Sequence, residues 1–138
     1  HVSSRRQRQM CIRDRIRRAH RVRKLLGGGM RQIGILAAAG IYALDHHVER
    51  LAEDHANAIR LAEMLAELPQ VTVDPGEVET NMVFAGFPEG ASAPLQTHLR
   101  DSGILINLDT PHIRLVTHLD CRADEIDLFV EEVKGFFA

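Results

Sequence analysis

Aromatic residues, cysteines and long apolar runs are all scarce in this sequence. Of its 138 residues, 4% are aromatic, none is tryptophan and two are cysteines. Cys11 and Cys121 are too few and too far apart for a disulfide framework or a four-ligand zinc site. The longest apolar run, about residues 33–44, is broken by Gly34 and Gly40 and is shorter than the ~20 residues of a membrane span. We therefore expect a cytoplasmic protein without a metal site or a membrane segment.

The remaining composition is that of one ordinary soluble domain. The chain is 45% hydrophobic and 26% charged. A chain of this length can bury roughly two-thirds of the surface that its unfolded form exposes. It therefore needs neither disulfides nor a metal ion to fold, and two domains of full size do not fit.

The charges are divided unevenly along the chain. Residues 1–31 contain eleven arginines and lysines and one acid, whereas the remaining residues are strongly acidic. Positive charge of this kind is typical of transit peptides and of nucleic-acid tails. The segment starts with a histidine, has few serines and lacks the aromatic residues that stack on bases. A small module that binds nucleic acid or another polyanion through this basic helix is kept as the alternative function.

The origin of residues 1–15 is interpreted separately from that of the rest of the basic segment. The stretch from Val2 to Arg15 resembles the conceptual translation of a sequencing adapter and has no apolar periodicity. We expect it to be an artefact, disordered and without stabilising contacts. The fold prediction therefore starts at Ile16.

Residues 16–68 are predicted to be helical. Apolar residues recur at three- and four-residue spacing up to Leu26, and Gly27–Gly29 must then form a turn with access to positive φ. A second helix is expected from Met30 to Leu44, and because it is apolar on nearly all sides it should be buried. Too little of this chain surrounds it, so we expect that the surface it packs against is missing here or belongs to another subunit. The clearest amphipathic helix is Val48–Leu68, which a proline ends.

Residues 69–138 alternate between short strands and helices. Strands are expected at 71–73, 80–87, 104–108 and 113–119, and helices at 94–102 and 122–137. This order lacks the unbroken β-α-β alternation of a parallel sheet. It predicts a small α+β domain with a mostly antiparallel sheet and helices on one face, separated from the helical part at residue 68.

The glycine turn between the first two helices is a candidate anion site. Unpaired backbone N–H groups at a helix N-terminus attract phosphate, and the flanking Lys24 and Arg31 add positive charge. No Lys-Ser/Thr follows the last glycine and no strand precedes the turn, so neither nucleotide-binding glycine motif is present. A flexible interhelical turn is the alternative.

Arg114 is the second candidate. In a strand it shares a face with Val116 and His118, in the middle of an apolar stretch. An arginine there needs an anion or solvent, and its planar fork suits a carboxylate. A solvent-facing arginine is the alternative. The histidines show no metal-ligand spacing, and Cys121 beside two aspartates is a poor nucleophile.

Taken together, four segments resemble the low-specificity L-threonine aldolases. They are residues 17–44, 53–55, 80–82 and 114–120, which occur in the same order in that family. The resemblance implies a pyridoxal 5′-phosphate enzyme of the α/β, aspartate-aminotransferase-like fold (fold type I). Such an enzyme cleaves L-threonine or L-allo-threonine, small β-hydroxy amino acids, to glycine and acetaldehyde by a retro-aldol reaction. It implies a homodimer or homotetramer, with no nucleic-acid partner.

The resemblance also assigns residue roles. Arg114 would hold the substrate α-carboxylate, and Arg31, with Lys24 beside it, would reach the cofactor phosphate of the neighbouring subunit. The family's Schiff-base lysine lies in a Ser-Lys-Gly context upstream of the basic helix. The two lysines here, Lys24 and Lys134, lack that context. We therefore expect a C-terminal fragment that has no catalytic residue of its own and is inactive alone.

Overall fold

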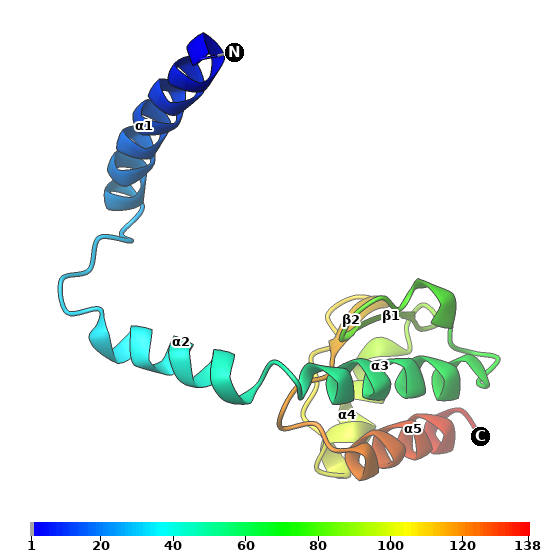
Figure 1. Ribbon diagram of the computed structural model, residues 1–138. Helices are drawn as coiled ribbons and strands as arrows, with labels where there is room; N and C mark the ends of the chain where they lie inside the picture. The colour runs from blue at the N-terminus through cyan, green and yellow to red at the C-terminus, as the bar shows by residue number, and fades with distance from the viewer. Residues whose placement is uncertain (1) are drawn as a thin grey trace. The chain divides into compact units, whose positions relative to one another are not determined.

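The computed structural model describes residues 2–138, with side chains from residue 12 onward. The chain divides into two compact units, His1–Asp45 and His46–Ala138 (Figure 1).

The first unit contains α1 (Val2–Leu25) and all but the last residue of α2 (Gly34–His46). The prediction that residues 1–15 are disordered is wrong for the backbone of residues 2–15, which is helical. This stretch has no glycine or proline and is rich in arginine and glutamine, residues that favour helix. Apolar periodicity, which was missing, indicates where a helix is buried, but an exposed helix can form without it.

The glycine turn ends α1 as predicted. Gly27 adopts a φ of +82°, a conformation that favours glycine. The N–H of Gly27 donates to the carbonyl of Lys24 at 3.3 Å, and the N–H of Gly28 donates to the carbonyl of Arg23 at 2.8 Å. These two bonds form a Schellman cap. The second helix starts at Gly34 rather than near Met30, because a further short loop follows the cap.

Helix α2 is exposed in this chain. All its residues are exposed, including Ile35 at 84% and Leu44 at 71%, which agrees with the prediction that too little of this chain surrounds the helix to bury it. A helix that is apolar on all sides needs apolar partners on all sides. Among the residues that the structure describes in this unit, the other helix is strongly basic, and it offers no such surface.

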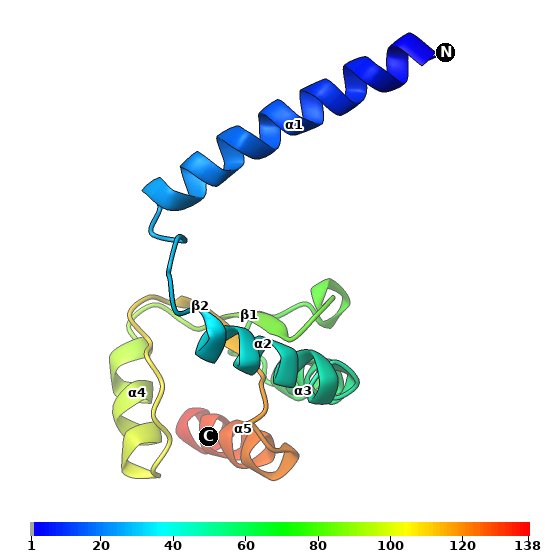
Figure 2. The same ribbon diagram turned by 60° about the vertical axis from the view of Figure 1, so that its left-hand side comes forward.

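The second unit packs three helices against a small sheet. In chain order it contains α3 (Leu51–Ala66), the 3₁₀ helix η1 (Pro75–Glu77), β1 (Met82–Gly86), α4 (Ser92–Asp101), β2 (His112–Val116) and α5 (Ala123–Phe137). The strands β1 and β2 pair antiparallel, with Met82 opposite Val116 and Gly86 opposite His112. Figures 1 and 2 show α3, α4 and α5 on the same side of the strands. The predicted antiparallel sheet with helices on one face is confirmed.

The core of this unit joins its helices to the inner face of the sheet. Its fully buried side chains include Leu65 on α3, Val83 on β1, Leu95 and Leu99 on α4, and Val133 on α5. Because α3 packs against β1 and α5, it belongs to this unit. The unit therefore begins at His46, and the predicted boundary after residue 68 is wrong.

Two predicted strands are absent from the described sheet. Residues 71–73 contribute a single bridge, Thr72 to Gly86, because Pro69 and Pro75 bracket the segment closely. Residues 104–108 keep the side-chain alternation of a strand, since Leu105 is 86% exposed and Leu108 is buried. They form no ladder, because burial of alternate side chains does not require a paired backbone.

Candidate functional site

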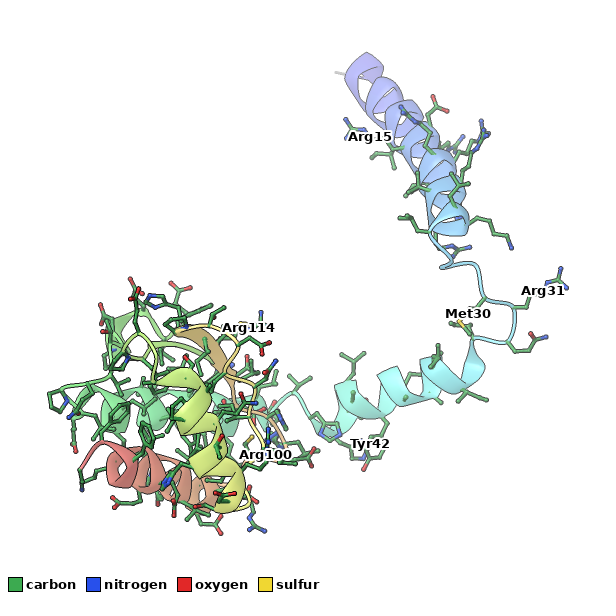
Figure 3. All side chains as sticks on the ribbon, turned by 180° about the vertical axis from the view of Figure 1, so that it is seen from behind. Arg15, Met30, Arg31, Tyr42, Arg100 and Arg114 are labelled. Carbon is green, nitrogen blue, oxygen red and sulfur yellow. The ribbon has the colours of Figure 1, made fainter. Side chains whose placement is uncertain are left out.

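Arg114 lies at the centre of β2 on the face of the sheet away from the helices. Ile113 and Leu115 pack against the core, whereas Arg114 and Val116 are exposed. The period of two along the strand therefore placed Arg114 correctly. Figure 3 labels Arg114 on this strand. Phe84 is its directly opposite neighbour on β1.

Arg114 borders two hollows. One, of about 470 Å³, is also lined by Asp74, Glu77 and His112. The other, of about 650 Å³, lies along residues 102–107 and is also bordered by Thr117 and His118. Arg114 makes no hydrogen bond or ion pair with any residue that the structure describes. Its fork of five donors is therefore available to an anion from outside.

The surroundings of Arg114 are largely apolar for an exposed surface. Phe84 is 65% exposed, and Met82 and Val116 are 39% and 38% exposed on the same face. Apolar neighbours lower the local dielectric once another surface or a ligand covers them. A carboxylate bound there would gain more from the guanidinium than it would in open water.

A polar junction that the sequence analysis missed lies at the end of β2. Thr117 is 2% exposed, and its hydroxyl donates to the backbone carbonyl of Asp54 at 2.6 Å. Its N–H donates to the carbonyl of Asn81 at 3.0 Å, and the Asn81 side-chain amide donates to the Thr117 carbonyl at 2.7 Å. The junction therefore ties β2 to α3 and to the residue that precedes β1.

The same junction contains a buried carboxylate. Asp54, 3% exposed, accepts from both terminal nitrogens of Arg50 one helical turn earlier, one of them at 3.0 Å. The Asn57 amide donates to the Cys121 carbonyl at 3.2 Å and adds a second tie between α3 and the segment after β2. Asp54, Asn81 and Thr117 lie in three of the segments that carry the resemblance, which gives those segments a shared structural role.

Lys24 and Arg31, the two predicted phosphate ligands, belong to the first unit. Both are exposed, and Figure 3 shows Arg31 projecting from the loop between α1 and α2. The Lys24 side chain lies along the glycine turn, because a Cβ added at Gly29 would come within 2.6 Å of its Cδ. The N–H groups of Gly27 and Gly28 donate to carbonyls of α1. Only backbone N–H groups that follow Gly28 in the turn could therefore donate to an anion.

Lys134, the other lysine of the chain, lies on α5 away from both hollows. Its side chain is 61% exposed and pairs with Glu131 at 3.7 Å. At the start of the same helix, a hydrogen bond from Arg122 to Asp124 raises the pKa of the Arg122 guanidinium, helped by the charges of Asp124 and Glu125. Neither group borders Arg114.

The described residues contain neither a metal-binding cluster nor a membrane-spanning helix. No group of three histidine, cysteine, aspartate or glutamate side chains in residues 12–138 is arranged to hold a metal ion. None of the helices in the described part of the chain combines the length and the apolar character needed to cross a membrane.

Comparison with known proteins gives a consistent set of relatives. Low specificity L-threonine aldolase of Escherichia coli strain K12 is 46% identical over 126 residues, which is 91% of this chain and 37% of that protein. Low-specificity L-threonine aldolase 1 of Arabidopsis thaliana is 42% identical over 107 residues, 75% of this chain and 30% of that protein. A probable low-specificity L-threonine aldolase of Schizosaccharomyces pombe is 46% identical over 116 residues, 84% and 29% respectively.

The chain thus spans about a third of the length of these relatives. The family profile of the beta-eliminating lyases matches residues 9–87, more than half of the chain. This match begins inside the segment that was interpreted as adapter sequence. From the profile match and the consistent relatives we conclude that the chain belongs to the beta-eliminating lyase family, a family of pyridoxal 5′-phosphate enzymes of fold type I.

Proposed function

We propose that this chain is part of a pyridoxal 5′-phosphate-dependent threonine aldolase. The reaction is cleavage of the Cα–Cβ bond of L-threonine or L-allo-threonine, which gives glycine and acetaldehyde. The names of the relatives that match 75–91% of the chain support this proposal. The comparisons give no support to the alternative, a polyanion-binding module.

Arg114 is the residue on which the proposal depends most. A guanidinium without a partner among the described residues, at the centre of an apolar sheet face, matches the two oxygens of an α-carboxylate. Two parallel hydrogen bonds would fix both the position and the rotation of the amino acid. The scissile Cα–Cβ bond is then oriented before reaction, which is an efficient use of binding energy.

The residues of the glycine turn fit the cofactor's phosphate. Lys24 and Arg31 are exposed cations that flank the turn, and glycine at position 29 leaves room for the Lys24 side chain to lie across it. Both can donate to a phosphate dianion, Arg31 through two nitrogens and Lys24 as a point charge. When bound, the cofactor ring supplies the electron sink that bond cleavage requires.

The chain alone should not catalyse this reaction. Neither of its lysines lies in the Ser-Lys-Gly context, and Lys134 lines neither hollow beside Arg114. We propose that the full enzyme is a cytoplasmic homodimer or homotetramer. A subunit interface would also cover helix α2. In an isolated chain, the exposed apolar surface of this helix costs free energy.

A hybrid enzyme tests the role of Arg114. The hybrid carries this chain in place of the matching 126-residue segment of the Escherichia coli aldolase. Replacing Arg114 with glutamine should lower kcat/KM for L-threonine about ten- to hundredfold, because a charge-assisted contact worth about 1.5–3 kcal/mol is lost. Arg114→Lys should fail as well, since it keeps the charge but loses the fork.

Arg100→Gln is the matched control. Arg100 is an exposed arginine on α4 and lines neither hollow, so its replacement should leave kcat/KM unchanged. Near-full activity of Arg114→Lys, or unfolding of both Arg114 variants, would show that Arg114 is solvent-facing or structural instead.

A further inference from the structure

The pairing between β1 and β2 continues one residue beyond the strands, and it does so in an unusual way. Asn81 lies opposite Thr117 in the antiparallel register that pairs Met82 with Val116. The Thr117 N–H donates to the Asn81 carbonyl, as in an ordinary ladder. The return bond, to the Thr117 carbonyl, comes from the Asn81 side-chain amide.

Thr117 is consequently fixed at all three of its polar groups. Its N–H and its carbonyl are bonded to Asn81, and its hydroxyl is bonded to the Asp54 carbonyl in the first turn of α3. The residue is 2% exposed, so water does not compete for these bonds. Asp54 is held in turn by the two contacts from Arg50.

This arrangement determines which face of the sheet carries Arg114. The ladder of β1 and β2 is five residues long, and a slip of one residue would turn every side chain of β2 to the opposite face. Arg114 would then point into the core beside Val83. Thr117, three positions later, has a hydroxyl partner on α3 in the observed register, and the slipped register would move that hydroxyl away from Asp54.

We propose that Thr117, together with Asn81, is a positioning residue for Arg114. Its bonds to Asn81 and to α3 lock the register of β2 and so keep the Arg114 guanidinium aimed at the substrate carboxylate. This inference rests on the proposed function, because it takes carboxylate binding by Arg114 as given. The two residues themselves touch neither substrate nor cofactor in this role.

The test measures how strongly the hybrid enzyme distinguishes a carboxylate from an amide. Glycine carries the α-carboxylate that Arg114 would bind, and glycinamide lacks it. The ratio of their inhibition constants against L-threonine cleavage reports on Arg114 specifically. A general loss of folded enzyme lowers kcat but leaves this ratio unchanged, so the ratio separates positioning from stability.

Thr117→Val removes the hydroxyl and nearly preserves the shape of the side chain. It should reduce the preference for glycine about tenfold or more, since a misplaced binding group costs up to about a hundredfold. Thr117→Ser should restore the preference because it restores the donor to the Asp54 carbonyl. If Thr117→Val does not fold, Asn81→Asp is used instead, because it removes the amide donor to the Thr117 carbonyl. The ratio of the inhibition constants of glycine and glycinamide is then measured for that variant.

One control matches the Thr117→Val change chemically. Thr97→Val also removes a threonine hydroxyl that donates to a backbone carbonyl, that of Ala93 at 3.0 Å on α4. This change should leave the preference for glycine intact.

The outcomes separate the inference from the function on which it rests. Loss of preference in Thr117→Val with recovery in Thr117→Ser supports the positioning role. An unchanged preference in folded Thr117→Val or Asn81→Asp, beside a lost preference in Arg114→Gln, overturns that role and leaves the carboxylate proposal standing. An unchanged preference in Arg114→Gln overturns both.

Discussion

Phe84 and Arg114 lie directly opposite each other across β1 and β2, on the face of the sheet that the helices leave uncovered. An aromatic ring and a cation thus stand at the distance of a cross-strand pair, about 4.5–5.5 Å between Cβ atoms. The side chain at position 84 therefore affects the Arg114 guanidinium, which we propose binds the substrate carboxylate.

Phe84→Glu should affect stability and activity in opposite directions. A carboxylate opposite Arg114 would pair with it, and opposite charges across a strand pair contribute roughly 0.2–1 kcal/mol. The isolated chain should therefore melt slightly higher, while the hybrid enzyme should lose affinity for L-threonine because the new side chain competes for Arg114. Phe84→Gln, which is similar in shape but uncharged, should show a smaller loss of affinity. Equal losses in the two variants would argue against competition.

Gly27→Ala and Gly40→Ala should change the helix content in opposite directions. At Gly27 the φ of +82° strains any other residue by about 1–2 kcal/mol, so alanine should fray the end of α1. At Gly40, in the middle of α2, an added Cβ meets open space, and alanine should gain about 1 kcal/mol in helix propensity. Far-UV circular dichroism of the two variants provides the comparison, and a loss of helix in Gly40→Ala would be evidence against the exposed position of α2.

Deleting residues 2–15 should leave the thermal unfolding of the second unit unchanged. That unit has its own core, and the described side chains from residue 12 to Leu26 are exposed. The midpoint measured by near-UV circular dichroism, which reports on the packed phenylalanines of α5, is the relevant observable. A decrease of several degrees would mean that the segment contributes to the fold.

The isolated chain should not become labelled by its cofactor at a defined lysine. Equimolar pyridoxal 5′-phosphate followed by borohydride should leave Lys24 and Lys134 essentially unmodified, as mass spectrometry can show. Lys134 is exposed, is paired with Glu131 and lies outside both hollows beside Arg114. The intact Escherichia coli aldolase treated in parallel is the positive control. Stoichiometric labelling of Lys24 would contradict the prediction that this chain lacks the Schiff-base lysine.

Much of the second unit could be predicted from its periodicity. Helices α3 and α5 have one apolar stripe each, and the predicted and observed bounds of α5 differ by one residue at its start. The alternation around Arg114 also separated it and Val116 correctly from Ile113 and Leu115, which lie on the opposite face. These patterns succeed because burial against one core imposes a period of 3.6 on a helix and of 2 on a strand.

The polar junction could not be predicted in this way. Asp54, Asn81 and Thr117 come from segments far apart in the sequence, and each looks like an ordinary cap, turn or strand-edge residue in its local context. Their contacts depend on how three elements dock, which local periodicity does not record. The exposure of α2 could be predicted, because too little of this chain surrounds a helix that is apolar on nearly all sides. The surface that covers it could not be predicted, since an apolar pattern states what a helix needs and does not say what supplies it.

The bond from Thr117 to Asp54 also has a consequence for the order of folding. It joins residues 63 positions apart, and so it closes a long loop whose entropy must be lost first. Local structure such as α3 can form early, whereas this bond can form only after β2 has arrived beside the helix. A strand that arrives one residue out of register finds no acceptor for its threonine and can still detach and pair again. The junction thus forms late in folding and stabilises only the register in which Arg114 faces outward.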